Sequence, residues 1–354
     1  MDTRRLLIDG LLQPLTDAGA RRCIQRLNEL FTTQRSQLNE YSADAALVSA
    51  YAAYYMPTNM QKLAFVISQV STLGIDATAP FEVVDFGCGP GTYGFAAAET
   101  TGVENGVFYF VDSSRVMLAQ AEKIQQLLYP RMTAVFGSTV PQKQPERLRL
   151  AVLGNVINEM EERSYAALFD KLNADVLILI EPGTQASFAG VSAVRTLLLN
   201  MGYAIQYPCP SAHACPVAGI DGEWCHQVLK ATLSPEIARL GQLAGLDRTV
   251  MPFIGHVYTR APQTVQSAVL YRLKTHSKHA LFWEACMATP NGLALKSLEL
   301  PKKAFSKKEQ KALLRINAGQ RLAFQIAKEL KNGVLRIEVP VFWGEVNGAV
   351  DSGG

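Results

Sequence analysis

The sequence predicts an α/β protein built on a doubly wound parallel sheet, with a helical region before it and a small, basic, β-rich unit after it. Strand-like and helix-like segments alternate between Phe81 and Leu199, which is typical of parallel sheets covered by helices. A glycine-rich turn, VVDFGCGPGT at 83–92, joins the first strand to the first helix. After residue 264 strands follow one another directly and basic residues dominate. We expect a helical region at 1–75, the α/β domain at 76–264 and the C-terminal unit at 265–354.

Apolar residues recur at helical spacing in the N-terminal region, which predicts helices there. The expected helices span Arg21–Arg35, Ala43–Tyr55 and Thr58–Leu73. Pro57 separates the last two, because proline lacks a backbone donor and interrupts a helix.

The α/β domain shows short apolar runs separated by amphipathic segments. Strands are expected at Phe81–Phe86, Val107–Val111, Arg149–Leu153 and Asp175–Ile180. Helices are expected at Tyr93–Glu99, Ser113–Leu128, Tyr165–Leu172 and Gly190–Leu199, the second capped by Ser113 or Ser114.

The C-terminal unit carries four expected strands and one helix, which the capping box Ser306–Glu309 opens. The strands are Ser267–Leu273, Ala280–Cys286, Leu293–Leu300 and Val334–Trp343. Residues 265–354 hold 14 Lys/Arg against 7 Asp/Glu, a balance that favours contact with phosphate backbones over the alternative of a merely solvated helical face. The candidate RNA-binding lysines in the densest stretch are Lys302, Lys303, Lys307 and Lys308.

Composition indicates an ordinary globular protein, with 48% hydrophobic and 18% charged residues. No apolar run reaches the roughly 18–20 residues of a membrane helix. The N-terminal segment carries Asp2, Asp9 and Asp17, which argues against a transit peptide, so we expect a cytoplasmic protein. Six cysteines in such a chain favour metal binding or buried thiols over disulfides.

The glycine loop predicts a cofactor site. Gly87, Gly89 and Gly91 stand where the backbone must approach a ligand or take a positive φ. The helix that follows offers N–H groups to a carboxylate, and Asp112 ends the next strand, where it can accept ribose hydroxyls. The spacing G-x-G-x-G departs from the dinucleotide fingerprint G-x-G-x-x-G.

Together these features resemble motif I and the following acidic residue of class I S-adenosylmethionine (SAM)-dependent methyltransferases, whose fold is Rossmann-like. The resemblance implies that SAM is the cofactor, that Asp85 orients the loop and that Asn155 lies near the cofactor. The alternative is a degenerate unit that keeps the turn without the ligand. No clear catalytic set is visible. Glu159 and Glu181 are candidates for a base, and the alternative for Glu181 is that it starts the turn at Pro182–Gly183 and caps the next helix.

Pro208–Cys209 is similar to the Pro-Cys of RNA cytosine-5 methyltransferases, although it comes later in the sheet than that nucleophile.

A second site is predicted in the segment PCPSAHACPVAGIDGEWCH at 208–226, which holds three of the six cysteines on a loop. A tetrahedral metal or a cluster needs about four soft ligands. His213 and His226 are alternative ligands that would favour zinc, and the spacing does not decide between zinc and iron–sulfur. Thiols without a metal are the remaining alternative. The cysteine candidates are Cys209, Cys215, Cys225 and, far downstream, Cys286.

The chain also resembles the methyltransferase-like assembly factors of the mitochondrial small ribosomal subunit and their bacterial relatives. The resemblance covers roughly residues 45–290 and rests on five segments: AYAAYYMPTNMQKLAFVISQV (50–70), the glycine loop, EPGTQASFAGVSAVRTLLL (181–199), PCPSAHACP (208–216) and EWCHQ (223–227). It implies that the four candidate cysteines bind a [4Fe–4S] cluster, and that Lys274 and Lys278 belong to a basic run before the fourth cysteine. The last 60 or so residues depart from the family, whose W-G-D is matched only by Trp343–Gly344–Glu345.

Three functions follow from these features. The first is a small-subunit assembly factor that binds SAM, an iron–sulfur cluster and ribosomal RNA, without membrane or DNA partners. The second is an active SAM-dependent rRNA methyltransferase. The third is an iron–sulfur redox or sensing protein.

Overall fold

The computed structural model describes residues 1–34, 41–70, 80–102, 106–263 and 267–342. The chain divides into two compact units. Unit 1 comprises Met1–Ala64, Gly74–Ile180 and Lys230–Met251, and unit 2 comprises Phe65–Leu73, Glu181–Leu229 and Pro252–Gly354. Among the described residues, no helix combines the length and the apolar character that crossing a membrane requires.

Unit 1 begins with helices whose apolar faces are buried. In α2 these buried residues include Ile24, Leu27 and Leu30. The expected break at Pro57 is wrong, because the last three N-terminal helices follow one another without interruption. Pro57 is the second residue of α5, directly after the π-helix η3, and the run of helices continues through it. The helices are α1 (Thr3–Arg5), the π-helix η1 (Leu6–Gly10), α2 (Asp17–Thr32), α4 (Ala45–Ala50), the π-helix η3 (Tyr51–Tyr55) and α5 (Met56–Ser68).

The parallel sheet of unit 1 has the order β3-β2-β1-β4-β5. Its central strands are almost wholly buried, because helices lie between consecutive strands and pack on the sheet. The strands are β1 (Phe81–Phe86), β2 (Val107–Val111), β3 (Thr133–Gly137), β4 (Leu148–Gly154) and β5 (Val176–Pro182). The helices are α6 (Thr92–Thr101), α7 (Arg115–Leu128), α8 (Tyr165–Leu172) and α10 (Pro235–Ala244), with the short 3-10 helices η4 (Ile157–Glu159) and η5 (Glu162–Ser164). This arrangement confirms the doubly wound, class I methyltransferase-like fold class.

A buried ion pair joins two neighbouring strands of this sheet. Glu82 on β1 and Arg149 on β4 are register partners, and Arg149 Nε lies 2.6 Å from Glu82 Oε1. Both side chains are fully buried. Arg149 Nη1 also donates to the carbonyls of Pro141 and Leu172, each at 3.0 Å. Unit 1 therefore neutralises this buried guanidinium with a carboxylate, although Arg149 Nη2 and Glu82 Oε2 have no hydrogen-bond partner among the described residues.

Unit 2 contains α9 (Gln185–Asn200) and three strands, with β6 (Ala204–Tyr207) antiparallel to β8 (Val250–Thr259) and β7 (Gln227–Lys230) paired to β8.

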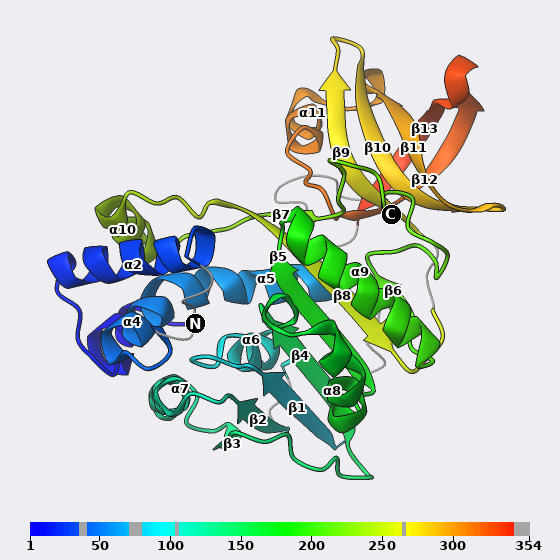
Figure 1. Cartoon of the computed structure of the whole chain (residues 1–354). Helices are drawn as coiled ribbons and strands as arrows, with labels where there is room; N and C mark the ends of the chain where they lie inside the picture. The colour runs from blue at the N-terminus through cyan, green and yellow to red at the C-terminus, as the bar shows by residue number, and fades with distance from the viewer. Residues whose placement is uncertain (35–40, 71–79, 103–105, 264–266, 343–354) are drawn as a thin grey trace. The chain divides into compact units, whose positions relative to one another are not determined.

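The remaining strands of unit 2, yellow to red in Figure 1, close into a five-stranded barrel of order β10-β11-β13-β12-β9. Trp283, Leu281 and Leu298 are among its core residues. A closed five-stranded barrel is the architecture of OB-folds, and it confirms the expected small β-rich unit. Its elements are β9 (Ala268–His276), β10 (Ala280–Thr289), β11 (Gly292–Pro301), η6 (Lys302–Ala304), α11 (Lys307–Leu313), β12 (Arg321–Glu329), η7 (Lys331–Gly333) and β13 (Leu335–Phe342).

Candidate cofactor and metal sites

The glycine loop links β1 to α6, and each of its glycines has a positive φ: +66° at Gly87, +53° at Gly89 and +88° at Gly91. A Cβ on Gly87 would lie 2.5 Å from Val156 Cγ2, and one on Gly91 would lie 2.4 Å from Phe95 Cε2. A Cβ on Gly89 would meet no atom closer than Met117 Sδ at 3.9 Å. Gly87 and Gly91 therefore serve packing, whereas the open side of the loop lies at Gly89.

Asp85 holds the loop against the start of α6. Its Oδ2 accepts hydrogen bonds from Tyr93 N at 3.1 Å and from Gly94 N at 2.7 Å. Oδ1 is buried without a hydrogen-bond partner among the described residues. Burial raises the pKa of Asp85 to about 7, against the opposing effect of the two backbone bonds, and Asp112 raises it further. The orienting role expected for Asp85 corresponds to these two bonds.

The expectation that the first amides of α6 are open to a carboxylate is not met. Thr92 N donates to Cys88 O at 3.3 Å, and the next two amides donate to Asp85. The N-terminal donors that helices leave unpaired are thus already used within the protein.

Asp112 lies beside the open side of the loop. Its Oδ2 accepts from Gly89 N and its Oδ1 from Ser114 N, both at 2.8 Å. A carboxylate has about four acceptor positions, so two remain for a ligand. Asn155 follows β4 with a φ of +61°, which the short amide side chain tolerates. The open glycine and the adjacent carboxylate fit an adenosyl ligand.

Tyrosines from the N-terminal helices lie near this site, which the sequence did not predict. Tyr51 stacks on Tyr41 and Tyr55, with ring centroids 6.2 and 5.7 Å apart. Burial raises the pKa of Tyr41, and Tyr51, Glu159 and Asp112 raise it further. Burial also raises the pKa of Tyr51 and of Tyr55, so these hydroxyl groups stay protonated.

The four candidate cysteines of unit 2 line one pocket, and all six cysteines of the chain are free thiols. Burial raises the pKa of Cys225, and the neighbouring Cys209, Cys215 and Cys286 raise it further. For Cys286 the same causes raise the pKa to about 12. The fold therefore brings Cys286, which lies 61 positions after Cys225 in the sequence, to the cysteine loop.

Two buried arginines accompany these thiols. Arg195 donates from Nη2 to the carbonyls of Ser211 and His213, at 3.2 and 2.7 Å. Arg321 donates to Gln206 O and lies over the Tyr207 ring. Both guanidinium groups affect Cys209 electrostatically, and no carboxylate forms an ion pair with either within the described ranges.

The alternative histidine ligands do not line this pocket. His213 Nδ1 bonds with Ser211 Oγ at 3.0 Å, and His226 Nδ1 contacts Trp224 O at 3.2 Å. In the described part of the chain, no three His, Cys, Asp or Glu side chains are arranged to hold a metal ion. The thiols fit a metal centre in number, kind and shared pocket, but they are not at ligating positions here.

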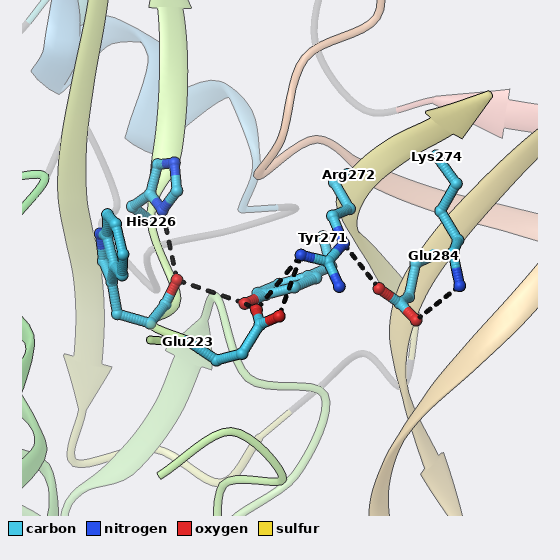
Figure 2. Close-up of polar contacts among 7 residues, drawn as sticks. Glu223, His226, Tyr271, Arg272, Lys274 and Glu284 are labelled. Atoms are coloured by element: carbon cyan, nitrogen blue, oxygen red, sulfur yellow. Dashed lines mark hydrogen bonds and ion pairs between the residues drawn. The ribbon is translucent and has the colours of Figure 1, made fainter. Parts of the chain in front are cut away.

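A polar network crosses from the cysteine loop to the barrel (Figure 2). Tyr271 donates to Glu223 at 2.5 Å, and its hydroxyl also lies 3.4 Å from Trp224 O. Arg272 bonds Glu223 at 3.1 Å and Glu284 at 2.8 Å. Because Tyr271 also lines the cysteine pocket, this network fixes the E-W-C-H segment to β9.

The lysines proposed to contact RNA have different environments. Lys302 departs from the expectation, because it is only 8% exposed and its Nζ donates to Ser277 O at 2.6 Å. Its ammonium group supports the turn before β10 instead of facing solvent. Lys274 pairs with Glu284 at 3.5 Å. Lys278, Lys303, Lys307 and Lys308 are exposed, as is Lys274.

A family model described as mitochondrial small ribosomal subunit Rsm22 matches residues 45–249. The chain belongs to this family. The resemblance expected from the sequence motifs is thereby confirmed. The Rsm22 match includes the glycine loop, Asp112 and the three cysteines of the loop, and it ends before Cys286 and the lysines.

Among curated protein sequences, none matches the chain. Several solved methyltransferases are similar to it at low identity. The plantazolicin methyltransferase BpumL is 11% identical with a TM-score of 0.36, over 69% of this chain and 96% of that one. A human methyltransferase 10 domain containing protein is 13% identical with a TM-score of 0.33, over 58% and 83%. TrmK of M. capricolum, solved with S-adenosylhomocysteine, is 10% identical with a TM-score of 0.32, over 58% and 70%.

Proposed function

We propose that the chain is an assembly factor of the small ribosomal subunit that uses its methyltransferase fold to bind SAM as a structural or sensing ligand. The observation that carries this proposal is the Rsm22 family match across residues 45–249, which includes the glycine loop. The sequence shows no residue set that clearly supplies a catalytic base, so binding ranks before methyl transfer.

At the glycine loop, the chain's own residues would hold the cofactor by its adenosyl part. Gly89 lets the backbone approach, Asp112 accepts hydrogen bonds from the ribose hydroxyls, and Asp85 keeps the loop in place. Bound SAM supplies an electrophilic methyl group. Asn155 would contact the ligand from the end of β4.

For the cysteine pocket we propose a [4Fe–4S] cluster, with zinc as the alternative, bound by Cys209, Cys215, Cys225 and Cys286. Four thiolates around either centre leave a net negative charge. The buried Arg195 and Arg321, which lack carboxylate partners among the described residues, support an anionic group there. The cluster would connect the cysteine loop to β10.

For the C-terminal barrel we propose contact with ribosomal RNA. OB-fold barrels bind oligonucleotides on their surfaces, and Lys278, Lys303, Lys307 and Lys308 present exposed ammonium groups on this one. Lysine–phosphate contacts make binding salt-dependent, so the affinity should fall as salt rises.

Asp112→Ala tests the order of these functions. We expect loss of SAM binding, measured by calorimetry, with the variant still co-sedimenting with small ribosomal subunits and supporting their assembly. Asp170→Ala, an exposed carboxylate on α8, is the matched control. Failed assembly together with the loss of a specific rRNA methyl mark would favour the active methyltransferase instead.

Anaerobic purification followed by analysis of iron, sulfide and zinc tests the cysteine site. About four iron and four sulfide per chain are expected for a [4Fe–4S] cluster. Stoichiometric zinc without iron and sulfide would show a zinc site in place of the cluster. A protein that contains neither iron nor zinc would contradict a metal site at these cysteines.

The N-terminal composition predicts a cytoplasmic protein, whereas the family description names a mitochondrial subunit. We propose the cytoplasmic location, which cell fractionation tests.

A further inference from the structure

Arg248 lies in unit 1, shortly after α10, among residues of the N-terminal helices. Its Nε donates to Thr58 Oγ1 at 2.8 Å and its Nη2 to Asn59 Oδ1 at 2.9 Å. Its guanidinium carbon lies 4.7 Å from the centre of the Tyr55 ring. These contacts fix the guanidinium group in one orientation, and they leave Nη1 without a partner among the described residues.

No carboxylate forms an ion pair with Arg248 in the part of the chain that the structure describes. Burial lowers the pKa of Arg248, and the neighbouring tyrosines oppose the shift. Arg248 is half-buried, and a cation partly withdrawn from water is destabilised unless an anion is near it. The buried Arg149 in the same unit is paired with the carboxylate of Glu82. Arg248 differs from Arg149 because no carboxylate of the described residues pairs with it.

A second polar group beside Arg248 also lacks a partner. Tyr55 is 4% exposed, and its hydroxyl makes no hydrogen bond to any described residue. Burial keeps this hydroxyl protonated by raising its pKa. A guanidinium and a neutral hydroxyl are both donors, and a carboxylate accepts from both.

The donors of Arg248 are close to the glycine loop. Asn59, which Arg248 contacts, donates to Tyr51 OH at 3.3 Å. Tyr51 stacks on Tyr41, and the next residue, Ser42, accepts a hydrogen bond from Ser114, whose amide donates to Asp112. The electrostatic neighbours of Arg248 also include Tyr93 of α6. These contacts lead from Arg248 to the residues beside the glycine loop.

The amides at the start of α6 do not supply a carboxylate site, because Cys88 O and Asp85 already accept from them. A ligand that carries an amino-acid carboxylate into this loop therefore needs another donor. Resting on the proposed SAM binding, we propose that Arg248, with the Tyr55 hydroxyl, binds the α-carboxylate of the methionyl group of SAM.

The test compares SAM with decarboxylated SAM, two ligands that differ only in this carboxylate. The wild-type protein should bind SAM more tightly, and Arg248→Met should remove that preference. Truncating one partner of a charged hydrogen-bonded pair costs on the order of 100-fold in affinity. Decarboxylated SAM should bind Arg248→Met within about 3-fold of wild type, which shows that the adenosyl site is intact.

Arg239→Met is the matched control, because Arg239 is an exposed arginine on α10. If Arg248→Met does not fold, Arg248→Lys replaces it. Lysine keeps the charge but loses the planar fork, so a preference reduced by about 10-fold is expected.

If Arg248→Met keeps the wild-type preference for SAM over decarboxylated SAM, the inference about Arg248 is wrong while the proposed SAM binding stands. Loss of rRNA affinity with an unchanged preference would also overturn it and would assign the anion to an RNA phosphate. A wild-type protein that binds neither ligand would overturn the SAM proposal and the inference together.

Discussion

Asp85 should make the free energy of unfolding depend on pH, and Asp85→Asn should remove that dependence. The carboxyl is 1% exposed, and burial raises its pKa from 3.8 to about 7. Between these values the folded state binds a proton that the unfolded state does not. Its stabilising contribution is therefore present below about pH 4 and is lost as the pH rises through about 7.

The magnitude follows from the same two values. Integrating the linkage relation between pH 5 and pH 8 gives a loss of about 2–3 kcal/mol in the free energy of unfolding. Asparagine does not titrate, and its amide oxygen can still accept from Tyr93 N and Gly94 N. In Asp85→Asn, the difference between pH 5 and pH 8 should therefore shrink by about 2–3 kcal/mol, whatever the absolute stability of the variant.

Urea unfolding at pH 5 and pH 8, followed by far-ultraviolet circular dichroism, measures this difference. Asp44→Asn is the matched control, because Asp44 is an exposed carboxylate that also accepts two backbone N–H groups at a helix start. Exposed carboxyl groups titrate mainly below pH 5, so this variant should behave as wild type. Equal pH dependence in wild type and Asp85→Asn would refute the argument, because the buried carboxyl would then be ionised throughout.

Three further predictions concern the two units. Arg149→Met should lower the free energy of unfolding by about 3–5 kcal/mol, because it leaves Glu82 charged and buried, and adding Glu82→Met should restore most of it in urea unfolding. Gly89→Ala should weaken SAM binding, measured by calorimetry, by at least about 10-fold. It should lower the free energy of unfolding by only about 1–2 kcal/mol, because alanine is strained at this positive φ but meets no close atom there. The double variant Lys307→Glu and Lys308→Glu should weaken rRNA binding and reduce the salt slope of the affinity by roughly 1–2 in filter-binding titrations; an unchanged slope would contradict the role of these lysines.

The sequence predicts the strands of the α/β core well, because each strand is indicated by residues that are close together in the sequence. Every expected strand from Phe81–Phe86 to Asp175–Ile180 is present, since each is an apolar run bounded by turn residues. The capping box of α11 is confirmed by both bonds, Ser306 N to Glu309 Oε2 at 2.6 Å and Glu309 N to Ser306 Oγ at 3.3 Å. Such a helix start depends on residues three positions apart, so it can be predicted from the sequence.

Features that depend on tertiary contacts were not predicted. β12 was missed although Leu322, Phe324 and Ile326 alternate in its sequence, and only its first two residues are buried in the barrel. β3 is similarly exposed. Lys302 looks like its neighbours in a basic run, yet its ammonium group turns inward to Ser277 O. The W-G-E segment at 343–345 lies outside the described residues.

The arginines show why the sites needed the structure. Nothing in the sequence around Arg149, Arg195, Arg248 and Arg321 shows which of these arginines has a carboxylate partner. Arg149 meets Glu82, whereas the other three meet carbonyls, amides, hydroxyls or rings. Such contacts orient a guanidinium without neutralising it. Two of the three unneutralised arginines accompany the four thiols and the third lies near the glycine loop, so the charge balance of each candidate site favours an anionic ligand there.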